Sequence, residues 1–483
     1  MPPTTTTLAN VSASSITEEK TFAKDPAWLA EDRKIALAKY LSLPNEVSPL
    51  YSKYTDANRI KPQSIHLDFA EQNNKNGIKH AKSGDLAKRL EELEKETGIL
   101  QIGSEISKVV VKENIAKQGV IVTGIKDAVA RHPDIVRAHM EANPLDHSED
   151  KFMALEAAAF QSGVFIYVPR NVVLEDPIRI ITSLADDGTS LVSRNIFIAE
   201  QGSKATVVQE LYAPGTAGGN SETQQSYFEL IETSVKPNAH LEVVTLQAMD
   251  TDTVCVSNRK AFVERDAKMS WYVGLFGTML SRFKTDSVMK GQGASAEDVE
   301  IVFGVGNQSF DIMSNLIHNG PFSRGKVQVK SVMKDTSKSL FKGMIKIDKQ
   351  GKGTESYLAG HAILLDKGAK SDSIPGLEIL TNEVRATHSA SVAQIDENQI
   401  FYLTTRGLSR EGAKREIVSG FLEPLSRKMG PTIRAWINYL IENKWQGNPL
   451  MLRADEAMEQ ILEVEKSRYR ETQDIFEKHY KYR

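Results

Sequence analysis

Short apolar runs recur from Val164 onward for more than two hundred residues, and this repetition constrains the fold more than any other feature of the chain. Each run has the length of one β-strand and is closed by Gly, Lys, Asp, Asn or Ser, as in VFIYVP, RNIFIAE, HLEVVTLQAM and KVQVKSVM. We expect no helical segment between these runs. The rhythm predicts a mainly β body, and periodicity alone leaves an antiparallel sandwich and a parallel β-solenoid as alternatives.

Helical patterns flank this body on both sides, so we expect five segments. Residues 1–24 are rich in Thr and Ser and predict a disordered lead, which is followed by a mainly helical region over 25–163. Strands occupy 164–395, a C-terminal helical domain occupies 396–445, and a charged helical extension occupies 446–483.

Apolar spacing and capping residues locate the individual helices. In the N-terminal region we expect helices within 25–44, 85–98, 126–143 and 150–163, with Asp85 as the cap and Gly98 as the end of the second. In the C-terminal domain, Ser409 starts a helix that stops before Gly430, and a further apolar stripe follows over 433–441.

The charge balance and cysteine content argue against several functional classes. The chain has 60 Lys and Arg against 63 Asp and Glu, so no excess of positive charge favours binding to nucleic acid. Cys255 is the single cysteine, which rules out an intrachain disulfide and supplies too few thiolates for a cluster held by this chain alone. We expect a cytoplasmic protein with no membrane span and no signal peptide.

Common catalytic and nucleotide-binding motifs are missing from the sequence. The Gly-rich spots GVG and GKG lack the GK[ST] ending of a phosphate-binding loop, and no GxSxG or HExxH pattern occurs. Among the ten histidines, we expect His132 and His139 to be surface or capping residues and His361 to lie in the core. Cys255 alternates with two valines, so we expect it to point inward as a small hydrophobe.

His388 differs from its neighbours on one strand face. A period of two places it in a row with Val384, Ala386, Ala390 and Val392, where it is the only titratable group. One interpretation is a buried histidine that is hydrogen-bonded to a carbonyl. The alternative is a metal ligand or proton carrier at the rim of an interface.

Several stretches resemble the SufB/SufD family, the paired scaffold subunits of the SUF iron-sulfur cluster assembly machinery. Because the matches follow one another along most of the chain, they are more specific than a single motif. The resemblance implies a right-handed parallel β-helix (β-solenoid) core, whose two ends the N-terminal and C-terminal helical regions cap. The matching stretches are DPAWLAEDRK at 25–34, DKFMALEAAAFQSGVFIYVPRNVVLEDPI at 150–178, KGMIKI at 342–347, THSASVAQID at 387–396 and ENQIFYLTTRGLSREGAKREIVSGF at 397–421.

Within this family the chain is more similar to the SufD branch. Ile379 stands where the sulfur-accepting branch carries a cysteine, and His388 stands where the SufD branch has a functionally implicated histidine. Ala386 is a departure, because SufD sequences often have a cysteine at that position. The resemblance also implies a SufC-type ABC ATPase that docks on the C-terminal helices at Arg406, Gly407, Ser409, Ile417 and Phe421.

Our first hypothesis is a non-catalytic SufD-like scaffold that pairs with a SufB-type subunit through the C-terminal strands of both solenoids. His388, with Glu378 and Glu383 as weaker candidates, would lend a ligand to iron or to a transient iron-sulfur cluster shared with the partner, while a cysteine desulfurase acts indirectly. Within the family, the alternatives are a SufB-like subunit or a homodimeric scaffold. From another class, a β-solenoid glycan-active enzyme would use paired carboxylates.

Overall fold

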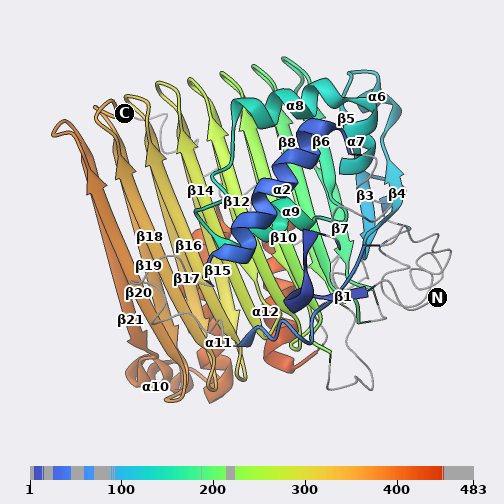
Figure 1. Ribbon diagram of the computed structural model, residues 1–483. Helices are drawn as coiled ribbons and strands as arrows, with labels where there is room; N and C mark the ends of the chain where they lie inside the picture. Colours follow the sequence, from blue (N-terminus) through green and yellow to red (C-terminus); the bar gives the residue numbers. More distant parts are fainter. Residues whose placement is uncertain are drawn as a thin grey trace.

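The chain folds into a parallel β-solenoid of about 8 turns (Figure 1). The computed structural model describes residues 5–13, 15, 25–44, 59–69, 89, 91, 93–185, 188–213, 223–448 and 450. Consecutive strands alternate between two sheets, so that each turn contributes one strand to each sheet. Every neighbouring pair of strands within a sheet from β6 (Val164–Val168) to β21 (Arg385–Gln394) is parallel, which confirms the solenoid over the sandwich.

The strands grow from short pieces at the N-terminal end to a uniform ten residues at the C-terminal end. The nine-stranded sheet contains β5 (Ile121–Gly124), β6 (Val164–Val168), β8 (Leu191–Ala199), β10 (Ser226–Val235), β12 (Val254–Val263), β14 (Leu280–Met289), β16 (Ser309–His318), β18 (Lys338–Ile347) and β20 (Lys370–Ile379). The ten-stranded sheet contains β4 (Glu105–Val110), β3 (Thr97–Ile102), β7 (Ile178–Ser183), β9 (Lys204–Tyr212), β11 (His240–Gln247), β13 (Lys268–Leu275), β15 (Ser295–Gly304), β17 (Arg324–Met333), β19 (Glu355–Leu364) and β21 (Arg385–Gln394).

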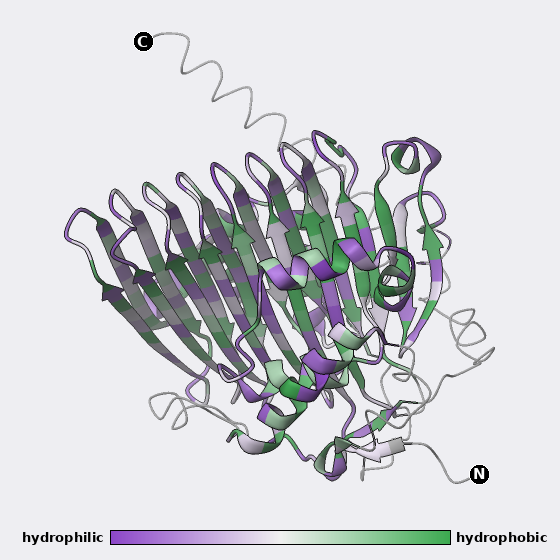
Figure 2. Cartoon of the chain, turned by 45° about the horizontal axis from the view of Figure 1, so that its top comes forward, coloured by the Kyte–Doolittle hydropathy of each residue, from purple (hydrophilic) through white to green (hydrophobic). Residues whose placement is uncertain are grey.

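Side chains along each strand alternate between the solenoid interior and an outer face, because the strand period is two. Figure 2 shows the result as hydrophobic and hydrophilic segments that alternate along the strands. The interior cluster includes Trp271, Phe283 and Phe341, all of which are buried. Residues at the same register stack from turn to turn, so each turn buries its apolar side chains against the turns beside it.

Helices of the N-terminal region cover one half of the nine-stranded sheet on its outer face (Figure 1). The guanidinium of Arg33 on α2 donates to the carbonyl of Ala158 on α9 at 2.9 Å and pairs with Asp25 at 2.7 Å. Two of the sequence stretches singled out above, 25–34 and 150–178, therefore meet in space. The helices are α2 (Ala27–Ser42), α6 (Glu113–Ala116), α7 (Ile125–Arg131), α8 (Pro133–Ala142) and α9 (Lys151–Ala159).

The structure corrects several sequence predictions in this region. The single helix expected over 126–143 is two helices, because Pro133 has no N–H to continue the first and instead starts α8. Gly98 lies in strand β3 and not at a helix end, and Asp85 lies outside the described residues. A disordered lead does not describe residues 5–10, since β1 (Thr5–Thr7) pairs with β2 (His66–Asp68) and is followed by the 3-10 helix η1 (Leu8–Asn10).

Three helices follow the last strand: α10 (Glu397–Thr405), α11 (Arg410–Ser426) and α12 (Pro431–Gln446). The side chain of Ser409 accepts a hydrogen bond from Gly412 N, so it caps α11 as predicted. The apolar faces of α11 and α12 pack on the outer face of the ten-stranded sheet, together with Tyr272 and Ile301. The first residue of the predicted extension over 446–483, Gln446, is the last residue of α12, and apart from 446–448 and 450 the extension lies outside the described residues.

The C-terminal helices lie along the side of the solenoid and do not cover its end. In the described residues, β20 and β21 each pair with one strand only, β18 and β19 respectively. Within the described residues, the C-terminal helices therefore do not form the end cap that was expected there. This uncovered last turn is called the open end below.

Candidate functional site

The open end exposes apolar side chains that the turn before it buries. Leu377 and Ile379 on β20 follow Ile345 and Ile347 in register, and these two isoleucines are fully buried. Leu377 and Ile379 are each 39% exposed, because β20 is the last strand of its sheet in the described part of the chain. Exposed Leu380 and Val392 extend the apolar surface on both sheets. A solenoid end of this kind is a surface on which another protein can be buried.

His388 lies in the interior row of this open end. It follows the fully buried Leu358 in register, yet it is exposed because β21 is the last strand of its sheet. Its imidazole makes no hydrogen bond with any described residue, so the interpretation as a buried, carbonyl-bound histidine is wrong. The predicted row is present, since Val384 and Ala386 pack against the interior cluster beside it.

The two weaker candidates do not join His388 in a ligand set. Glu378 is exposed on the outer face of β20 and pairs with Lys346 at 3.0 Å. Glu383 is exposed in the loop between β20 and β21, where its backbone carbonyl accepts a hydrogen bond from Gly353 N at 2.6 Å. His388 is thus the one predicted ligand that faces the mouth of the solenoid.

A second exposed surface lies beside the open end, on α10 and the turn into α11 (Figure 1). Phe401 is 70% exposed and Tyr402 is 57% exposed, and Leu408 is exposed in the turn. The guanidinium of Arg406 lies over the ring of Tyr402, 5.2 Å from its centroid. Gly407 has φ +94°, a left-handed conformation that glycine adopts without strain, and it allows the sharp turn between the helices.

The residues predicted for ATPase docking divide between this surface and the body of the protein. Arg406, Gly407 and Ser409 are exposed in the turn. Ile417 and Phe421 are half-buried and pack against the cluster between α11 and the ten-stranded sheet. Sequence reasoning did not single out Phe401 and Tyr402 as site residues, although two adjacent large aromatics at the start of a helical region are a signal for an exposed anchor.

Two histidines are placed differently from the sequence prediction. His361 lies on the outer face of β19 and not in the core, because Leu358, Gly360 and Ala362 take the interior positions around it. Its Nδ1 is 2.7 Å from Ser391 Oγ. His139 is buried and contacts Ser234, whereas His132 does occupy the junction between α7 and α8 as a capping position.

Cys255 points into the solenoid as predicted and is completely buried. Burial raises the pKa of its thiol well above the usual value, and the nearby carboxylate of Glu229 raises it further. Only the thiolate is a good nucleophile or metal ligand, so this cysteine is not reactive in the folded chain.

Beside Cys255 lies a buried polar cluster that the sequence analysis missed. Glu229 is its centre and accepts hydrogen bonds from Asn195 at 2.8 Å, Ser257 at 2.9 Å and the Tyr227 hydroxyl at 2.9 Å. Interior carboxylates need such donors, because desolvation of a charge is costly. The signal in the sequence was the charged residue Glu229 at the one interior position between the buried Tyr227 and Ile231.

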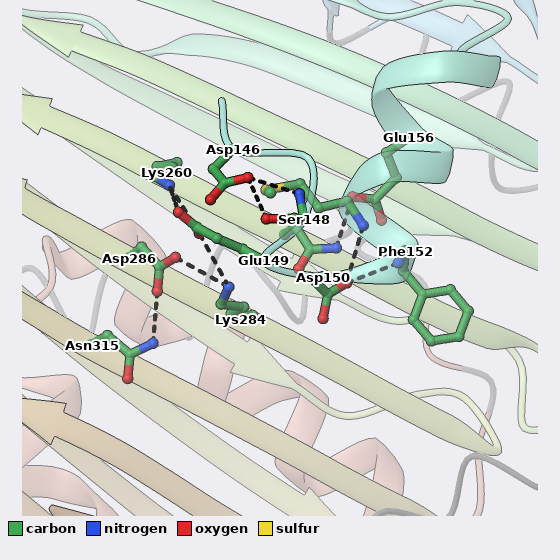
Figure 3. A network of polar contacts seen from close by, with 12 residues as sticks. Asp146, Ser148, Glu149, Asp150, Phe152, Glu156, Lys260, Lys284, Asp286 and Asn315 are labelled. Carbon is green, nitrogen blue, oxygen red and sulfur yellow. Dashed lines mark hydrogen bonds and ion pairs between the residues drawn. The ribbon is translucent and has the colours of Figure 1, made fainter. Parts of the chain in front are cut away.

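On the outer face of the nine-stranded sheet, a loop before α9 is tied down by charged contacts (Figure 3). Lys260 donates to Glu149 Oε1 at 2.8 Å, and Lys284 reaches both Glu149 and Asp286. The Asp150 side chain accepts hydrogen bonds from the first turn of α9 and also pairs with Arg282 at 2.6 Å. This network joins the N-terminal helices firmly to strands β12 and β14.

These arrangements suit the open end to the binding of a partner protein. Within the described residues, no group of three or more His, Cys, Asp or Glu side chains is placed to hold a metal ion. Over the same residues, no helix combines the length and the apolar character that a membrane crossing requires. The fold and the site define a β-solenoid protein that presents docking surfaces around one uncovered end.

Comparison with known proteins identifies the family. Residues 181–421 match the family described as "SUF system FeS cluster assembly, SufBD core domain", and residues 18–180 match the "SufBD protein N-terminal region". An "Iron-sulfur cluster assembly SufBD family protein" of Staphylococcus epidermidis is 25% identical over 446 residues, which cover 90% of this chain and 92% of the relative. A Staphylococcus aureus protein of the same description is 26% identical and covers 72% of this chain and 74% of its own length. The chain belongs to the SufBD family, as its resemblance to SufB/SufD stretches predicted.

Proposed function

We propose that this chain is a SufD-like scaffold subunit of iron-sulfur cluster assembly, which pairs end to end with a SufB-type solenoid subunit. The observation that carries the proposal is the open end, where β20 and β21 keep free edges beside exposed Leu377, Ile379 and Val392. A second solenoid whose last turn is also open would continue both sheets and bury these side chains.

In this proposal the chain positions the partner subunit and offers one imidazole at the seam, and the partner provides the thiolates. Ile379 offers no thiol at the open end, and Cys255 is enclosed. His388 would lend one imidazole nitrogen to iron, or to a transient cluster that is cargo at the seam, and Glu378 and Glu383 are secondary candidates at its rim. Imidazole is a suitable ligand for iron. The chain itself catalyses no reaction in this scheme.

The surface on α10 and the following turn is the proposed docking site for a SufC-type ATPase. Phe401 and Tyr402 supply exposed aromatic area, and Arg406 supplies a cation held against an aromatic ring. Aromatic and Arg residues dominate the binding energy of most protein interfaces. We therefore assign the anchors to α10 and assign to Ile417 and Phe421 the role of holding α11 on the body.

The test is co-expression of the chain with candidate SufB-type and SufC-type subunits, followed by isolation of the complex and measurement of cluster formation in cells. We expect a stable complex and a loss of cluster formation with His388→Ala. The matched control is His361→Ala, which removes an imidazole from the outer face of the neighbouring strand. Full cluster formation with His388→Ala in an intact complex would remove His388 from the mechanism.

The same experiment separates the alternatives within the family. A complex that contains two copies of this chain and no SufB-type subunit would establish the homodimeric scaffold. Sulfur transfer to Cys255 from a cysteine desulfurase would establish a SufB-like role, which its burial argues against.

A further inference from the structure

An open groove of about 650 Å³ runs across the outer face of the ten-stranded sheet, next to the open end but separate from it. The first residues of β13, β15, β17, β19 and β21 form its base, and the segment after α11 reaches its side through Lys428. The central part of the same sheet face is covered by α11 and α12. The groove is thus a part of the sheet on which the described chain lays no helix.

Positive charge predominates in this groove. Lys268, Lys326, Arg324 and Arg385 line it, against Glu297 and Glu355. Glu297 is engaged by Lys428, and Glu355 is 4.0 Å from Arg324 and 3.8 Å from Arg385.

Among the described residues, the ammonium groups of Lys268 and Lys326 form no ion pair within 4.0 Å, although the charge of Glu297 acts on Lys326 and that of Glu242 on Lys268. Burial, and then the nearby charge of Lys428, lower the pKa of Lys326. Burial, followed by Lys268 and Lys204, lowers the pKa of the adjacent His240 to about 4. Burial is the larger cause of both shifts, and the neighbouring cations add to it in the same direction.

The cations are spaced regularly because they share one register row. Lys268, Ser295, Arg324, Glu355 and Arg385 stand side by side on consecutive strands. Strands lie about 4.8 Å apart, so the cations of this row recur about every 9.6 Å along a line of about 19 Å. An α-helix rises about 10.5 Å over seven residues, which is close to this repeat.

The alternation of charge favours a protein helix over a polyphosphate. A uniformly anionic chain would meet the carboxylate of Glu355 between Arg324 and Arg385, whereas a helix can place a neutral or basic residue there. Half-buried Tyr357, whose hydroxyl is 3.1 Å from Ser389 Oγ, adds a flat contact surface in the groove. We propose that this groove binds an acidic helix of a partner protein, with carboxylates at seven-residue intervals facing Lys268, Arg324 and Arg385.

The test measures binding of a defined peptide to the full chain. The probe is a fluorescein-labelled helical peptide of about 20 residues, rich in Ala and Gln, with Glu at every seventh position, and anisotropy reports its affinity at low and high salt. We expect salt-sensitive binding that the double variant Arg324→Glu and Lys326→Glu weakens by roughly tenfold or more. The matched control reverses two exposed cations elsewhere, Lys117→Glu and Arg131→Glu, and should leave the affinity unchanged.

A second variant guards against a loss caused by misfolding. Glu355→Gln removes the interrupting carboxylate and should tighten binding by roughly threefold. The proposal would be overturned if the control variant (Lys117→Glu and Arg131→Glu) lost as much peptide affinity as the groove variant (Arg324→Glu and Lys326→Glu), or if the groove variant kept the parent affinity. Tighter binding of polyphosphate than of the peptide would also overturn it. Because the assay uses this chain alone, its result is independent of the SufD-like scaffold proposal.

Discussion

The end-to-end pairing proposed for the solenoid makes a quantitative prediction for two substitutions, Ile379→Lys and Val392→Lys. In the described chain these side chains are 39% and 43% exposed at the mouth of the solenoid, one on each sheet. Burial of a whole aliphatic side chain stabilises by about 1.5–3 kcal/mol, so covering the exposed part of each contributes about 0.6–1.3 kcal/mol. The pair therefore contributes about 1–2.5 kcal/mol to association.

Lysine at these positions removes this contribution and adds a further cost. Each ammonium would lose part of its hydration on docking without a designed partner, which costs at least about 1 kcal/mol per group. The expected loss in the double variant is about 3–4.5 kcal/mol, which corresponds to a dissociation constant that rises by roughly 100-fold to 2,000-fold. The single chain should remain folded, because solvent already reaches both side chains.

Sedimentation velocity of the co-expressed complex over a dilution series measures this shift. The matched control is Val173→Lys, which introduces the same ammonium at a 56% exposed valine far from the open end in sequence and on another turn. A double variant that associates as tightly as the parent chain would show that the open end is not the pairing surface.

Three further predictions concern the interior and the N-terminal helices. Cys255 should resist alkylation by iodoacetamide in the native chain and react fully after denaturation, as quantified by mass spectrometry; rapid modification of the folded chain would contradict its enclosure. Glu232→Gln removes the charge from a buried ion pair with Arg194 at 2.6 Å and should lower the free energy of unfolding by about 3 kcal/mol in urea titrations. The control Glu141→Gln changes an exposed side chain of α8 and should alter the free energy of unfolding by less than about 0.5 kcal/mol. Burial raises the pKa of Asp298 to about 6, so the stability linked to its protonated form is complete below about pH 4 and is lost as the pH rises through about 6. Asp298→Asn should therefore be more stable than the parent chain at pH 8 and lose that advantage at pH 4. A stability difference that stays constant across this range would refute the assignment.

The period of two was sufficient to predict a mainly β body and the side of the strand on which His388 lies. It did not choose between a sandwich and a solenoid, and the solenoid was expected only from the resemblance to the SufB/SufD family. The sequence could not show that the last turn is uncovered, since that depends on where α11 and α12 pack after the chain reverses. One local signal was present. Pro375 is the only proline in the solenoid strands from β6 to β21, and proline within a sheet is typical of an edge strand. The prediction for His361 failed because apolar neighbours in sequence belong to both faces of a strand.

The composition of the two edge strands argues for a pairing that can be reversed. β21 reads RATHSASVAQ, so small and polar residues dominate it and Val392 is its only large aliphatic side chain. β20 carries Leu377 and Ile379 but also Pro375, which has no backbone N–H to donate to a partner strand. A permanently buried end would favour continuous apolar strands, whereas this one combines a modest apolar patch with an edge that water can solvate. The interface would then depend on backbone pairing along β21 and on a few side chains around His388, which places the proposed iron ligand where opening of the two subunits would expose it.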